Sequence, residues 1–158
     1  MAVLHRSDAL RLELPFMDRA CEAFIRLLAR VDDADDTRLL AAWRDLVDFA
    51  AESFAREDVW MRTTGFSSRR EHAVQHGVVL EVMREGVLQA AQGKLSQVRE
   101  MARQLRDWYG KHVQGMDAAL AFHLRGARLA PGSAEMQTPT PSSARCSLEA
   151  APEPTAPC

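Results

Sequence analysis

The chain has 158 residues, of which 47% are hydrophobic and 27% are charged, and its formal net charge is −2. This length and hydrophobic content suffice for one domain with a buried core. A charge so close to zero gives no broad basic field, so we expect no binding to nucleic acid or to anionic membranes. The sequence also has no apolar run near the roughly 18 residues of a membrane span and no signal-peptide pattern, which predicts a cytoplasmic protein.

The cysteines and prolines divide the chain into a folded part and a tail. Cys21, Cys146 and Cys158 are odd in number and irregularly spaced, which does not indicate a disulfide framework. All prolines except Pro15 lie after residue 130, in a stretch rich in Ser, Ala and Thr with few large apolar residues. We therefore expect a folded domain over residues 1–126 and a disordered tail over residues 127–158.

Apolar residues in the folded part recur at spacings of three and four, which predicts an all-α protein. The short connections between helices favour an up-down-up-down four-helix bundle. An N-terminal arm over residues 1–14 is expected to pack across it through Leu10, Leu12 and Leu14. The predicted helices span residues 16–31, residues 37–64, the segment between Ser68 and Gly93, and residues 95–124.

The helix ends carry recognisable signals. Gly65 and Gly93 are expected to end the second and third helices. The pattern Ser68-Arg69-Arg70-Glu71 is typical of a capping box, which would open the third helix. In the fourth helix, a regular helical period predicts that the inward-facing residues are Val98, Leu105, Trp108, Tyr109, His112, Met116 and Ala119.

Ionisable side chains lie on the apolar faces of three of these helices. Glu57 lies on the second helix, His72 and His76 are four residues apart on the third, and His112 is on the fourth. Such groups are costly in a core unless they are paired or bind a metal ion, and two histidines at this spacing can share one ion. A single core histidine is more commonly a hydrogen-bonded core residue, but the four residues together predict a metal site.

Other candidate residues fit this pattern less well. Asp117 follows His112 by five residues, which is about 140° further around a regular helix, so helical phase alone does not direct it inward. His5 and His123 show no such pattern and are expected at the surface. The sequence has no glycine-rich phosphate loop and no HExxH motif, so we do not expect an enzyme.

Four segments carry a resemblance to a known family. They are LELPFMDRAC, SFAREDVWM, GFSSRREHAVQH and WYGKHVQGMD, and together they span about residues 12–120. In order and spacing they resemble the hemerythrin family, specifically its bacterial single-domain members. The resemblance implies a four-helix bundle with two non-haem irons, bridged by a glutamate, an aspartate and an oxo group, that binds O₂ reversibly.

Carried over to this chain, the resemblance makes His72, His76 and His112 the ligands of one iron, and Glu57 and Asp117 the bridging carboxylates. The family's second iron, the one open to O₂, takes two further histidines. These positions are Cys21 and Ser53 here.

We therefore expect a second iron site that is degenerate. Cys21 is interpreted as a thiolate ligand or a redox-sensitive thiol, or else as a small buried hydrophobe.

The expected function is that of a hemerythrin-like protein that binds one iron or zinc ion and serves in sensing, storage or redox signalling. One alternative keeps a di-iron centre that binds O₂ or NO, or turns over peroxide, with Cys21 and water in place of the histidines. Another is a structural helical bundle without metal. A mononuclear iron with oxygen or peroxide chemistry is a further, less favoured alternative. The sequence identifies no protein partner.

Overall fold

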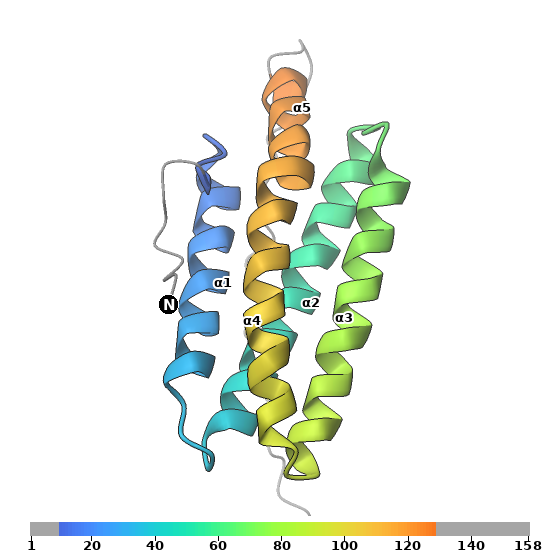
Figure 1. The fold of residues 1–158 in the computed structure, drawn as a ribbon. Coiled ribbons are helices and arrows are strands. Elements are labelled where there is room, and N and C mark those ends of the chain that lie inside the picture. The colour runs from blue at the N-terminus through green and yellow to red at the C-terminus, as the bar shows by residue number, and fades with distance from the viewer. Residues whose placement is uncertain (1–9, 129–158) are drawn as a thin grey trace, which may run out of the picture.

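The computed structural model describes residues 10–128, which form four antiparallel helices packed side by side (Figure 1). This confirms the predicted all-α bundle. His5, Cys146, Cys158 and most of the predicted tail lie outside the described residues. Within residues 10–128, no helix has the length and apolar character needed to cross a membrane. The helices are α1 (Pro15–Asp33), α2 (Leu39–Thr63), α3 (Arg69–Ala91), and a fourth built from α4 (Leu95–His112), η2 (Val113–Asp117) and α5 (Ala118–Arg128).

Consecutive helices pack against one another, and α1 also packs against α4, so the bundle closes on itself around one core. Pro15 occupies the first turn of α1, where its missing N–H costs no hydrogen bond. Gly65 and Gly93 have φ angles of +68° and +75°, which confirms both as the residues that end α2 and α3. Ser68 is the N-cap residue of α3, as the sequence pattern predicts, but its side chain makes no capping hydrogen bond, so the predicted capping box itself does not form.

The fourth helix contains a π-helical turn at η2, which the sequence analysis did not predict. A π turn holds one more residue than an α turn, so every later side chain points in a different direction around the helix axis than it would in a continuous α-helix. Met116 is therefore only half-buried and Ala119 is exposed, whereas Leu120 and Leu124 are fully buried. The predicted inward face was wrong beyond His112 because it assumed an unbroken period of 3.6.

The described end of the N-terminal arm packs on the bundle as predicted, with Leu10, Leu12 and Leu14 all buried. The Leu12 backbone N–H donates to the Asp18 carboxylate at 2.8 Å, and the Arg125 guanidinium donates to the Leu12 carbonyl. These bonds attach the arm to α1 and α5.

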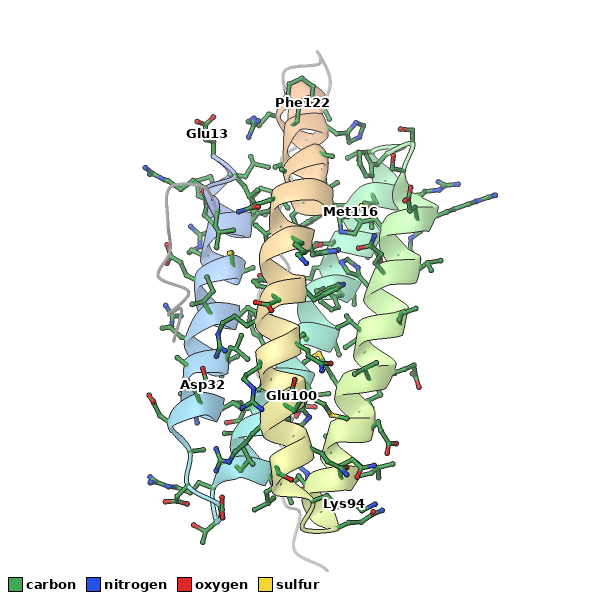
Figure 2. The ribbon with its side chains drawn as sticks, in the orientation of Figure 1. Glu13, Asp32, Lys94, Glu100, Met116 and Phe122 are labelled. Atoms are coloured by element: carbon green, nitrogen blue, oxygen red, sulfur yellow. The ribbon has the colours of Figure 1, made fainter. Side chains whose placement is uncertain are left out.

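Trp43 fixes the approach of α2 to α3. Its side chain is fully buried, and its indole N–H donates to the Met83 carbonyl at 2.8 Å. The indole fits because Gly86 has no side chain: a Cβ there would lie 2.6 Å from the indole nitrogen. Side chains fill the interior between the helices along the length of the bundle (Figure 2).

We expect Gly86→Ala to lower the free energy of unfolding by about 1–3 kcal/mol, because the rigid indole must shift to admit the new methyl group. Gly77→Ala on the same helix is the matched control, since nothing lies within 4 Å of a Cβ at that position. The control should gain up to about 1 kcal/mol from helix propensity. Urea unfolding of both variants measures the difference, and equal stabilisation by the two substitutions would contradict the steric argument.

Candidate metal centre

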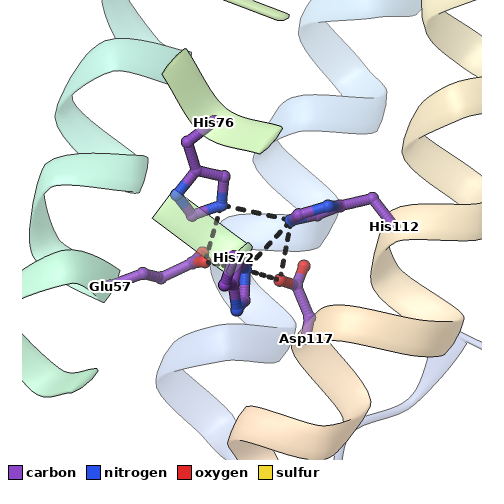
Figure 3. Close-up of side chains that lie close together, drawn as sticks. All are labelled: Glu57, His72, His76, His112 and Asp117. Carbon is purple, nitrogen blue, oxygen red and sulfur yellow. Dashed lines mark hydrogen bonds and ion pairs between the residues drawn. The ribbon is translucent and has the colours of Figure 1, made fainter. Parts of the chain in front are cut away.

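Five ionisable side chains converge at one point inside the bundle (Figure 3). Each offers one ligand atom, and these atoms all lie within 4.8 Å of one another. All five side chains are buried, with residue exposures from 0% to 6%. The sequence-predicted residues are therefore brought together. They are Glu57 from α2, His72 and His76 from α3, and His112 and Asp117 from the fourth helix.

The π turn explains how Asp117 joins the cluster. In a regular α-helix, Asp117 would lie about 140° away from His112 around the axis. In a π turn the C=O of residue i accepts a hydrogen bond from the N–H of residue i+5, so residue i+5 lies nearly above residue i. His112 Nε2 and Asp117 Oδ1 are consequently 3.2 Å apart.

The distances between ligand atoms match those around a single ion. His112 Nε2 lies 3.1 Å from Nε2 of both His72 and His76. Glu57 Oε2 lies 3.5 Å and 3.4 Å from these same two nitrogens, and Asp117 Oδ1 lies 3.2 Å from His72 Nε2. Ligand atoms about 2.1 Å from a metal ion are about 3.0 Å apart at right angles and about 4.2 Å apart when opposite. These contacts of 3.1–3.5 Å therefore have about the spacing of neighbouring ligands in one coordination shell.

The candidate metal-ligand atoms are also not fully satisfied by hydrogen bonds within the cluster. Glu57 Oε2 and Asp117 Oδ1 are buried and face Nε2 atoms of the histidines at 3.2–3.5 Å, without a hydrogen bond of regular geometry. Each Nε2–Nε2 contact can hold at most one proton, and His112 Nε2 takes part in two such contacts. A cation satisfies all of these atoms at once, so the residues present fit a metal ion.

Charges within the cluster shift the pKa values of its members. Burial lowers the pKa of His72, but the carboxylates of Asp117 and Glu57 outweigh this effect and raise that pKa to about 9. Burial raises the pKa of Asp117, but His112 and His72 outweigh it and lower that pKa to about 2. At neutral pH the metal-free cluster therefore holds a proton on His72 beside an ionised Asp117. A metal ion would replace that proton.

Stacked aromatic side chains fix the ring planes of two of the histidines in the cluster. Phe54 stacks on His76 with ring centroids 4.0 Å apart and an interplanar angle of 3°. Trp108 stacks on His112 with centroids 4.6 Å apart and an angle of 20°. Rings held in this way lose little rotational freedom when they bind an ion.

Cys21 is buried on α1, but it is not a member of the five-residue group in the described part of the chain. Its side chain instead forms a hydrogen bond with Tyr109, whose hydroxyl is the donor. Burial and the nearby Cys21, Asp117 and Glu57 raise the pKa of Tyr109 well above its usual range. The sequence pattern predicts Tyr109 only as an inward-facing core residue. Its position three residues before His112 was the signal that it lies beside the cluster.

His123 differs from its sequence-based expectation. It is half-buried, and its Nε2 lies 3.1 Å from the Thr64 carbonyl oxygen and 3.0 Å from the Thr64 hydroxyl. It joins α5 to the end of α2 and takes no part in the cluster.

The fold and the cluster define a class of protein, the four-helix bundle with a histidine–carboxylate metal-site candidate in its interior. No protein-family model matches the chain. A bacteriohemerythrin of Ralstonia nicotianae (strain ATCC BAA-1114 / GMI1000) is 31% identical over 124 residues, which cover 78% of this chain and 90% of that protein. The chain therefore belongs to the bacteriohemerythrin family.

The pKa shifts predict how the stability of the metal-free protein depends on pH. The pKa of His72 is raised from 6.5 to about 9, so its contribution is complete below pH 6.5 and is lost as the pH rises through 9. The pKa of Asp117 is lowered from 3.8 to about 2, so its contribution is complete above pH 3.8 and is lost as the pH falls through 2. We expect the chelator-treated protein to lose up to about 3 kcal/mol of unfolding free energy between pH 6.5 and 9.

Denaturant unfolding across this pH range measures the loss. His72→Gln cannot hold the proton, so its stability should change much less between pH 6.5 and 9. A wild-type stability that stays constant over this range, or an equal decline in the variant, would contradict the assignment of the proton to His72.

Proposed function

We propose that this chain is a non-haem metal protein that binds one ion, iron in the first place and zinc as the alternative. The ion would be held by Nε2 of His72, His76 and His112 and by the carboxylates of Glu57 and Asp117. The observation that carries the proposal is that these five ligand atoms lie within 4.8 Å of one another in a buried setting. Membership of the bacteriohemerythrin family supports iron.

The number of donors also favours iron. Zinc sites of structural type almost always have four ligands, whereas this cluster offers three nitrogens and two oxygens. A bound iron ion would supply a redox-active cation inside the bundle. The chain itself contributes a preformed ligand set, and its packed helices keep bulk water away from these atoms.

We further propose that the family's second iron site is degenerate here. Cys21 and Ser53 stand where the resemblance expects histidines, and both are buried. The hydroxyl of Tyr109 donates to Cys21, and its raised pKa keeps it neutral. A hydroxyl is a poor ligand and a thiol is a soft one, so these side chains are poorly suited to an oxygen-carrying iron. This supports a role in sensing, storage or redox signalling over O₂ transport or enzymatic catalysis.

Protein purified without added metal should contain about one iron or zinc ion per chain, as measured by elemental analysis. Removing the ion with a chelator should lower the melting temperature, because a ligand bound only to the folded state contributes about 4 kcal/mol at a free concentration of 1,000 times its Kd. A chelator that leaves the melting temperature unchanged would favour a structural bundle without metal. Two irons per chain would favour a di-iron centre.

Substitution of single histidines provides the matched comparison. His112→Ala removes a ligand and should strongly reduce the metal content. His123→Ala removes a half-buried histidine that contacts Thr64 and Phe66 and lies outside the five-residue cluster. The metal content of this variant should therefore equal that of the wild type. Equal metal loss in both variants would indicate a general loss of structure instead of a lost ligand.

The double substitution Cys21→His/Ser53→His tests the degenerate site. We expect it to raise the iron content toward two ions per chain, because it restores the two imidazole donors that the resemblance expects for a second iron. The reduced variant should then show an absorption change on exposure to O₂ that the wild type lacks. A wild-type protein that already gives a reversible change would contradict degeneracy and support the alternative in which the protein binds O₂ or NO.

A further inference from the structure

Two of the three ligand histidines face an oxygen atom at the ring nitrogen that points away from the cluster. His112 Nδ1 lies 3.1 Å from Gln75 Oε1. His76 Nδ1 lies 3.5 Å from Asp58 Oδ1, which is an ion-pair distance, and neither of these two atoms has a hydrogen-bond partner in residues 10–128. A carboxylate or amide oxygen can only accept, so each contact favours a proton on Nδ1. A neutral imidazole with its proton on Nδ1 carries its lone pair on Nε2, the atom that faces the cluster.

Aromatic contacts fix the planes of these two rings but not the position of their protons. The stacking of Phe54 on His76 and of Trp108 on His112 fixes each ring plane. A ring that cannot turn can still exchange its proton between the two nitrogens. The acceptor beyond Nδ1 favours the Nδ1–H tautomer, against Glu57 Oε2 and Asp117 Oδ1, which lie 3.4 Å and 3.2 Å from Nε2 of His76 and His112.

We propose that Asp58 and Gln75 are positioning residues, which hold His76 and His112 in the Nδ1–H tautomer and so direct both Nε2 lone pairs at the metal. The part that concerns metal affinity rests on the proposed function, whereas the tautomers are a property of the metal-free protein. Partners of this kind raise the basicity of a ligand imidazole, and their loss typically weakens metal binding 10- to 100-fold. Asp58 is a carboxylate and Gln75 a neutral amide, so His76 is the more strongly polarised of the two rings.

The position of Gln75 makes it a suitable residue to substitute. It is half-buried, and it borders a pocket of about 330 Å³ between α3 and the fourth helix. Leucine at this position leaves no sealed void in the core, so the variant should fold like the wild type. The other residues that line the pocket are Trp108, Lys111, His112, Gly115 and Met116.

Nitrogen-15 NMR of the imidazole rings in the metal-free protein tests the tautomers directly. We expect the Nδ1–H form for His76 and His112 in the wild type. Gln75→Leu should shift the populations of His112 alone, and Asp58→Ala those of His76 alone. Wild-type spectra that show the Nε2–H form for both rings would overturn the proposal, whether or not a metal binds.

Competition for Zn²⁺ against a chromophoric chelator tests the consequence for affinity. Gln75→Leu and Asp58→Ala should each bind Zn²⁺ 10- to 100-fold more weakly than the wild type, and Gln75→Glu, which keeps an acceptor, should restore the affinity. The controls Gln97→Leu and Asp48→Ala change exposed residues of α4 and α2 and should bind as the wild type does.

The outcomes separate the two proposals. A wild-type protein that takes up no Zn²⁺ or iron would refute the proposed function, and the NMR spectra would still decide the tautomers. A wild type that binds Zn²⁺, with Gln75→Leu and Asp58→Ala binding equally tightly, would overturn the positioning role and leave the proposed function standing.

Discussion

The structure depends on one electrostatic constraint: five ionisable side chains share a single buried point. Each would be costly alone in an apolar core, and together they are stable only because opposite charges face one another. The raised pKa of His72 and the lowered pKa of Asp117 express this mutual dependence in the metal-free protein. Because the five residues come from α2, α3 and the fourth helix, the cluster also joins these helices to one another.

A local irregularity completes this cluster. Residues 113–117 leave the α-helical period for one π turn, at the place where Asp117 must reach His112. π turns inside longer helices often occur at functional sites, because they redirect a side chain without ending the helix. After the turn, the apolar residues of α5 face the core again in a new phase, so the fourth helix keeps both the Asp117 carboxylate in the cluster and its own packing.

The cluster is asymmetric with respect to the bundle, because α1 supplies none of the five ligand atoms. The buried Cys21 of α1 is hydrogen-bonded to Tyr109. On that side Phe24 stacks on Tyr109 with centroids 3.7 Å apart. The ionisable side chains of the cluster therefore all come from α2, α3 and the fourth helix.

The sequence by itself determined the helices, the antiparallel bundle and four of the cluster residues, because a regular period places Glu57, His72, His76 and His112 on apolar faces. Gly65 and Gly93 likewise fixed two helix ends through their local backbone preference. The inward placement of Asp117 was decided by tertiary structure alone, since a π turn costs regular hydrogen bonds and persists only where packing and charge favour it. The same holds for the contacts of Asp58, Gln75 and Tyr109, which come from separate helices and meet only once the bundle has closed.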